Sequence, residues 1–163
     1  MRNLKLLLVG TLLLGIVSLF ASSTIARGGI LFKAKSFMNA SAEEIQQVAL
    51  DYTYGRFKVL SEAPTILLTR PVTKDELPSL GLSAIDFAGE EPPLMLVAMN
   101  GDFDVSNIRR SVSGALPFRV SYIVYVFDLK AGAPTLIQYS VDGSHFRKLL
   151  NDPNLPEEPP APD

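Results

Sequence analysis

The sequence predicts an α+β domain: an antiparallel sheet of about four to five strands, with an N-terminal amphipathic helix and short helices packed on one face. Three observations lead to this fold class. Residues 41–55 carry apolar side chains at helical spacing, and residues 118–128 alternate as a strand does. Hairpin-forming residues then join this strand to the next one, which makes the pair antiparallel. A hydrophobic leader precedes the domain.

The first helix has a clear start signal. Ser41 and Glu44 form a capping box, in which the Ser hydroxyl and the Glu carboxylate each accept a hydrogen bond from a free backbone N–H. The apolar positions that follow lie on one stripe at i, i+3, i+4 and i+7: Ile45, Val48, Ala49 and Tyr52. Gly55 can end the helix in the left-handed conformation.

Two extended segments are expected next, at residues 56–61 and 65–71. Thr73 and Glu76 form a second capping box, but Pro78 limits this helix to about one turn. After a loop, the nearly all-apolar residues 94–100 predict an interior strand.

Residues 101–104 are expected to turn the chain, because Gly and Asp are common turn residues. Asp104 can then cap a short helix. The apolar positions of that helix are Val105, Ile108 and Val112.

Residues 118–128 give the strongest strand signal. One face is apolar throughout: Phe118, Val120, Tyr122, Val124 and Val126. The other face begins with Arg119 and Ser121 and continues with Ile123, Tyr125 and Phe127. A strand apolar on one face and half apolar on the other belongs at the centre of a sheet, with part of its second face covered.

The C-terminal part of the domain follows from turn residues. Asp128 and Gly132 predict a hairpin turn, after which residues 135–141 form the returning strand. Asp142-Gly143 turns the chain again. Ser144 is expected to cap a last helical turn, which Pro153 stops and whose inward-facing residues are Phe146, Leu149 and Leu150.

The leader carries Arg2 and Lys5 before an apolar stretch, followed by small residues, as a secretory signal does. Residues 6–26 carry no charge and are also long enough to span a bilayer, so a signal peptide and an uncleaved anchor are both open. The chain has no cysteine, which excludes disulfides and a lipid-modified cysteine. We therefore expect an extracytoplasmic protein, secreted or anchored to the membrane by residues 6–26.

The chain divides into four parts: residues 1–26 as leader, 27–40 as linker, 41–150 as one small globular domain and 151–163 as a tail. The tail holds five prolines and four acidic residues without a basic one, which predicts a disordered, solvated segment. Loss of Arg2 and Lys5 with the leader changes the net charge from −2 to −4. This acidic balance argues against nucleic acid as a partner, because its binding needs a concentrated basic face.

Catalytic interpretations are weak. His145 is the only histidine and lies beside Asp142 and Ser144, but adjacent residues at a helix start point apart and cannot form a nucleophilic relay. The pattern is better explained by a helix cap with a half-exposed histidine. No nucleotide-binding fingerprint is present, so no cofactor is expected.

Metal and acid–base chemistry have equally weak signals. Asp102, Asp104 and Ser106 alternate like the first ligands of a calcium loop, but Asn107 and Ser113 stand where Gly and Glu are required, so no metal is expected. Carboxylates that acid–base chemistry would need are present at five positions: Asp86, Glu90, Glu91, Asp102 and Asp104. A catalytic pair among them would need burial to raise a pKa, and a Gly/Pro-flanked loop is more often solvated.

A binding role is favoured instead. The candidate binding residues are the rings of the predicted sheet, Tyr122, Tyr125, Phe127 and Tyr139, together with Arg109 and Arg110. Core packing explains most aromatic residues of this kind, yet one face of the strand can remain open to a peptide. Arg109 and Arg110 are suited to an anionic group or to a solvated helix end.

The leading functional hypothesis is therefore a non-enzymatic protein-interaction module that contacts another envelope or secreted protein. The first alternative is a carboxylate-dependent hydrolase acting on cell-envelope polymers, which requires two acids facing each other across a cleft. The second alternative is a carrier of small apolar ligands, which requires an internal pocket lined by aromatic rings. An uncleaved leader would add contact with the membrane.

Overall fold

The computed structural model describes residues 36–60, 62–106 and 118–158. The leader, most of the predicted linker, the helix expected after Asp104, and both Arg109 and Arg110 lie outside these ranges. Among the described residues, no helix is long and apolar enough to cross a membrane.

The described part of the chain forms a five-stranded antiparallel sheet with helices, so the predicted α+β class is confirmed. The strands are β1 (Lys58–Val59), β2 (Thr65–Val72), β3 (Leu94–Asp104), β4 (Arg119–Asp128) and β5 (Ala133–Ser140). β1 and β2 both pair with β3, β4 pairs with β3 on its other side, and β5 pairs with β4. β3 and β4 are therefore the inner strands.

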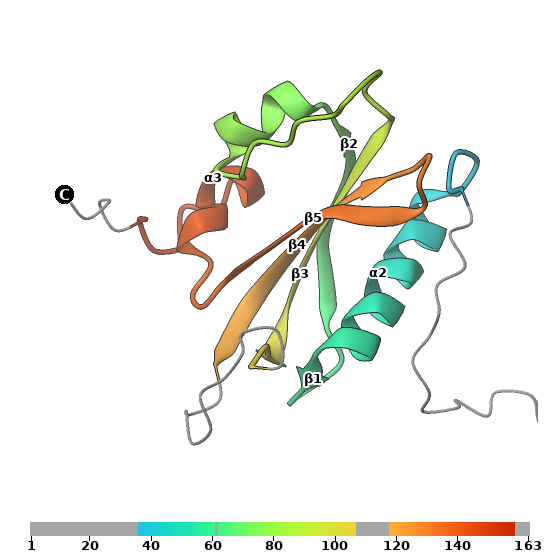
Figure 1. The fold of residues 1–163 in the computed structure, drawn as a ribbon. Coiled ribbons are helices and arrows are strands. Elements are labelled where there is room, and N and C mark those ends of the chain that lie inside the picture. Colours follow the sequence, from blue (N-terminus) through green and yellow to red (C-terminus); the bar gives the residue numbers. More distant parts are fainter. Residues whose placement is uncertain (1–35, 61, 107–117, 159–163) are drawn as a thin grey trace, which may run out of the picture. The chain divides into compact units, whose positions relative to one another are not determined.

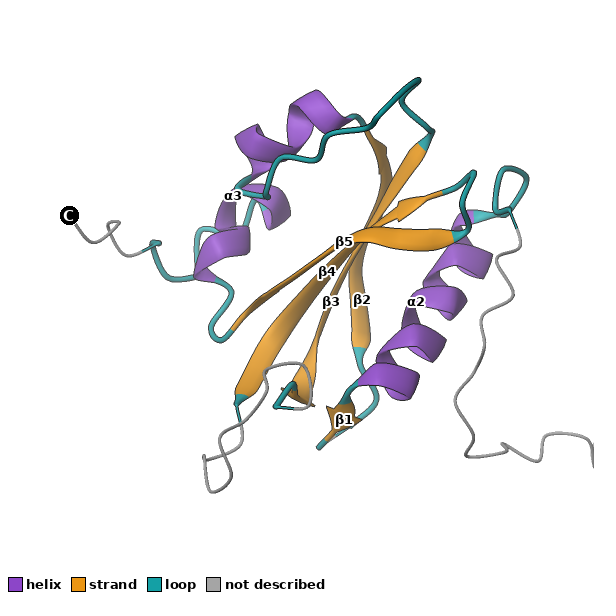
Figure 2. Ribbon diagram, in the orientation of Figure 1, coloured by secondary structure: helices purple, strands orange, loops and turns teal. Residues whose placement is uncertain are grey.

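Helical segments cover both faces of this sheet, which corrects the expectation that all of them pack on one face (Figures 1 and 2). Helix α2 (Ala42–Arg56) packs on one face. Three short segments pack on the other: η1 (Lys74–Leu80), η2 (Ser144–Phe146) and α3 (Arg147–Leu150). The reason is that both faces of the inner strands are apolar, so each face needs its own cover.

The two cores divide the side chains of β4. Ile123, Tyr125 and Phe127 are buried beneath α2, together with Ile45 and Ala49 of that helix. On the opposite face, side chains of β3 and β4 pack against those of the short helices. The buried residues there are Leu94, Leu96, Ala98, Val124, Val126, Leu77, Phe146 and Leu149.

β3 continues through residues 101–104, where the sequence predicts a turn. The register between β3 and β4 shifts between Asn100 and Phe103, which marks a β-bulge. Gly101 permits it, because a Cβ at that position would lie 2.6 Å from the ring of Phe103. At the start of β4, beyond the bulge, Val120 and the preceding residue Phe118 pack in the core beneath α2, not on the face of Val124 as predicted.

The N-terminal end of α2 is confirmed, since the capping box of Ser41 and Glu44 is present with hydrogen bonds of 2.8 and 3.2 Å. The C-terminal end differs from the prediction. Gly55 lies inside the helix, and the N–H of Phe57, already extended, donates to the Thr53 carbonyl. A left-handed cap is not needed, because the chain runs directly into β1.

The second capping box, Thr73 with Glu76, is also confirmed, although η1 is a 3₁₀ helix of seven residues that contains Pro78. The hairpin between β4 and β5 has the predicted chemistry. Asp128 Oδ1 accepts hydrogen bonds from the N–H groups of Lys130 and Ala131, and Gly132 has a φ of 68°.

Candidate functional site

A surface that carries both basic and acidic side chains lies where η1, η2 and α3 meet the C-terminal segment. A hollow of about 640 Å³ is lined there by polar and charged residues. We call this surface the C-terminal face and define it by His145, Arg147, Lys148, Glu157 and Glu158, all of which line the hollow.

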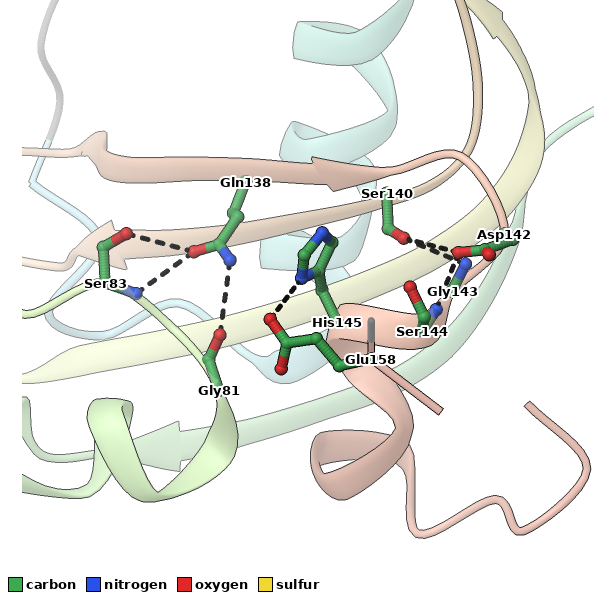
Figure 3. A network of polar contacts seen from close by, with 9 residues as sticks. All are labelled: Gly81, Ser83, Gln138, Ser140, Asp142, Gly143, Ser144, His145 and Glu158. Atoms are coloured by element: carbon green, nitrogen blue, oxygen red, sulfur yellow. Dashed lines mark hydrogen bonds and ion pairs between the residues drawn. The ribbon is translucent and has the colours of Figure 1, made fainter. Parts of the chain in front are cut away.

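A tight turn after β5 positions the start of this face (Figure 3). Asp142 Oδ1 accepts hydrogen bonds from the Ser144 N–H at 3.0 Å and from the Ser140 hydroxyl at 3.3 Å. The Ser140 hydroxyl in turn accepts from the Gly143 N–H at 3.0 Å. These bonds, above all the one from the Ser144 backbone, hold the pKa of Asp142 below its usual range.

The predicted turn at Asp142-Gly143 is therefore present, but Ser144 is not the cap. Gly143 occupies the position before η2 with a φ of 83°, and Ser144 is the first residue of η2 and buried. Only glycine fits there, because a Cβ would lie 2.8 Å from the Tyr122 ring and 3.0 Å from the side chain of Leu155.

A glutamine on β5 fixes the opposite wall of the hollow (Figure 3). The Gln138 side chain accepts a hydrogen bond from the Ser83 N–H at 3.1 Å and donates one to the Gly81 carbonyl at 3.3 Å. Gly81 ends η1 in the left-handed conformation, and a Cβ on it would lie 2.8 Å from the His145 carbonyl oxygen. The end of η1 is thus held close to the start of the C-terminal face.

The chain then reverses after α3. Asn151 takes the left-handed conformation, with a φ of 50°, and ends the helix. Asp152 Oδ1 accepts a hydrogen bond from the Asn154 N–H at 2.9 Å, which closes the next turn. Leu155 is then buried with 9% exposure beside the turn at Gly143. Leu155 therefore anchors residues 151–158 to the domain, although most side chains of this segment are exposed, as its composition predicts.

A hydrogen bond and an ion pair join this returning segment to η2 and α3. His145 Nδ1 lies 2.8 Å from Glu158 Oε1, as Figure 3 shows, and Arg147 Nη1 lies 3.0 Å from Glu157 Oε1. Arg147 also donates a hydrogen bond to the Pro153 carbonyl at 3.3 Å. The basic side chains of this face therefore contact two carboxylates and one main-chain carbonyl of the returning segment.

This geometry offers no nucleophilic relay. His145 Nδ1 contacts Glu158 and not Asp142, and the Asp142 carboxylate is engaged by the turn. Ser144 is buried, whereas His145 is exposed. The arrangement agrees with the prediction that neighbours at a helix start point apart.

Three of the predicted acid–base carboxylates have structural contacts. Glu91 accepts a hydrogen bond from the Lys74 N–H at 2.7 Å, and Asp102 lies 3.8 Å from Arg119. Hydrogen bonds from Ser106 hold the pKa of Asp104 below its usual range, opposite to the raised pKa of a general acid.

The remaining two, Asp86 and Glu90, are exposed in the loop before β3. Within the described ranges, no group of three or more His, Asp or Glu side chains is arranged to hold a metal ion.

The structure does not bring the four predicted aromatic residues to one surface. Tyr125 and Phe127 are fully buried beneath α2. Tyr139 is half-buried on that same side, in an edge-to-face contact with Phe118. Tyr122 packs against the opposite core, beside Gly143 and next to the C-terminal face.

Sequence analysis missed four residues of this face: Arg147, Lys148, Glu157 and Glu158. A signal for them exists, since two adjacent basic residues precede two adjacent acidic ones by ten positions. The tail composition concealed it, because prolines and acids together predict a solvated segment.

No protein-family model, curated protein or solved structure matches this chain.

Proposed function

We propose that this chain is a non-enzymatic protein-interaction domain, exported and either secreted or held at the outer face of a membrane by residues 6–26. The supporting observation is the C-terminal face, where a folded surface already holds a segment of the same chain through carboxylates that contact His145 and Arg147. Extended-segment recognition of this kind is common among small binding domains. The sequence of the leader supports export.

The alternatives have less support. A hydrolase needs two carboxylates that face each other across a cleft, with one pKa raised. The candidate acids instead serve a loop contact, an ion pair and a turn, or lie exposed. A carrier of apolar ligands needs rings around an internal cavity, whereas Tyr125 and Phe127 are packed against α2.

Site-specific photocrosslinking in the producing cells tests the interaction. A photoreactive amino acid replaces Lys148 on the C-terminal face, and a matched variant carries it at Gln47, an exposed position on α2, which covers the opposite face of the sheet. We expect a discrete protein adduct in the envelope or secreted fraction from position 148 and none from position 47. Equal adducts from both positions, or none, would contradict the proposal.

Mass spectrometry of the N-terminus together with cell fractionation tests export. A chain cut near residue 26, or an intact chain in the membrane fraction, supports it. An intact chain in the soluble cytosol contradicts it, and turnover of an envelope polymer by the purified protein would favour the hydrolase instead.

A further inference from the structure

We propose that the C-terminal face binds an acidic, extended peptide segment of a partner protein, and that Glu157 and Glu158 of the same chain occupy this face when the partner is absent. The inference rests on the proposed function and names the partner chemistry and the regulation of that site. The chain's own segment thus acts as an internal competitor.

The contacts of the face define the ligand chemistry. Arg147 contacts one carboxylate at 3.0 Å and a main-chain carbonyl at 3.3 Å. Its guanidinium can therefore bind both the acidic side chain and the backbone of a peptide. His145 holds a second carboxylate at 2.8 Å. Lys148 lines the same hollow and adds a third basic side chain. A peptide with two neighbouring acidic residues fits this spacing, because the chain's own peptide does.

The internal segment is anchored at one end and weakly held at the other. Leu155 is buried, which keeps Glu157 and Glu158 near the face at a high effective concentration. Both carboxylate contacts are exposed: the side chain of Glu157 is 87% accessible and that of Glu158 is 56% accessible. Exposed pairs of this kind contribute little each, so a partner can displace them while Leu155 stays in place.

The hollow beside these pairs provides room for the exchange. It has a volume of about 640 Å³ and is bounded on its far side by the end of η1 at Gly81. Because Gln138 fixes that wall, the face keeps its shape when the acidic residues leave.

A peptide-binding assay on the full chain tests the proposal. The probe is a fluorescently labelled peptide with the sequence of residues 156–163, and its anisotropy reports binding. The chain is compared with Glu157→Gln/Glu158→Gln, which removes the two acidic charges from the face and leaves its basic side chains unchanged. The control, Asp86→Asn/Glu90→Gln, makes the same change in net charge at exposed loop positions far along the chain.

We expect Glu157→Gln/Glu158→Gln to bind the probe about two- to thirtyfold more tightly than the unchanged chain, the range set by losing two exposed pairs. The control should bind as the unchanged chain does. Adding Arg147→Gln/Lys148→Gln should abolish the gain, and a probe with Gln in place of Glu should not bind. All these side chains lie at the surface, so circular dichroism should show the same fold in every variant.

Equal binding by all variants, or an equal gain in the control, would overturn the proposal. A concentration-dependent dimer that Glu157→Gln/Glu158→Gln dissolves would overturn it in favour of a second copy of the chain as occupant. These results are separable from the crosslinking result. An adduct from position 148 without peptide binding removes only this inference, whereas loss of both removes the proposed function as well.

Discussion

The hydrogen bond between Thr53 and Tyr125 leads to a quantitative prediction about the core beneath α2. Both side chains are fully buried, and the Thr53 hydroxyl lies 2.8 Å from the Tyr125 hydroxyl. The Thr53 hydroxyl also lies 2.7 Å from the Ala49 carbonyl, to which it donates its hydrogen. Tyr125 must therefore be the donor to Thr53, and Thr53 is the acceptor that satisfies it.

The substitution Thr53→Val removes that acceptor while keeping the shape of the side chain. The Tyr125 hydroxyl is then buried without a hydrogen-bond partner, which lowers the free energy of unfolding by about 1–3 kcal/mol. Tyr125→Phe should cost less, about 0.5–1.5 kcal/mol, because Thr53 keeps its bond to Ala49. The double variant should be little worse than Tyr125→Phe alone, since no buried hydroxyl of Tyr125 remains.

Urea unfolding followed by circular dichroism measures the four stabilities of this double-mutant cycle. Thr65→Val is the matched control: it removes a hydroxyl at an exposed position of β2, and its effect should stay within about 0.5 kcal/mol. If the two single effects simply add in the double variant, or if Thr53→Val costs no more than Thr65→Val, the hydrogen-bond argument is refuted.

Two further predictions concern glycine and the ionisation of tyrosine. Gly55→Ala should raise the free energy of unfolding by about 0.5–1 kcal/mol, because the position is helical and no atom lies within 4 Å of the new Cβ. Gly143→Ala should lower the free energy of unfolding by about 1 kcal/mol or more, because the position has a positive φ and the new Cβ would clash with Tyr122. Urea midpoints check both, and a stabilised Gly143→Ala variant would contradict the turn geometry. Burial raises the pKa of Tyr125, so as the pH rises the tyrosine loses its proton in the unfolded state before it does so in the folded state. The free energy of unfolding is therefore unaffected by this group below about pH 10 and decreases as the pH rises further. Ultraviolet titration should show one tyrosine that ionises at a higher pH than the others. If this late ionisation is still present in Tyr125→Phe, it does not belong to Tyr125.

Local signals in the sequence predicted the elements whose residues act on near neighbours. The capping boxes at Ser41 and Thr73 and the hairpin turn at Asp128 involve hydrogen bonds over two or three positions, and all three are present. The same signals failed at Gly55 and at residues 101–104. There the path of the next strand and a bulge opposite β4 decide the conformation, and both depend on distant pairing.

The candidate site was the least predictable part for the same reason. His145 and Glu158 are thirteen positions apart, and they meet only because Asn151 and the turn at Asp152 reverse the chain. Composition alone assigned this segment to solvent. The aromatic side chains of β4 were correctly placed on a central strand. The sequence did not reveal that the helices divide between the two faces, with Tyr125 and Phe127 beneath α2 and the short helices on the opposite side.

The burial of Leu155 has a practical consequence for anyone handling this protein. A version trimmed at residue 150, where the sequence predicts the globular domain to end, would lose the buried Leu155 side chain that lies beside Gly143. A polyhistidine purification tag fused after Asp163 would place fresh positive charge only a few positions from Glu158. Reagents for this chain are therefore better designed to keep residues 151–158 and to add no charged tag beside them.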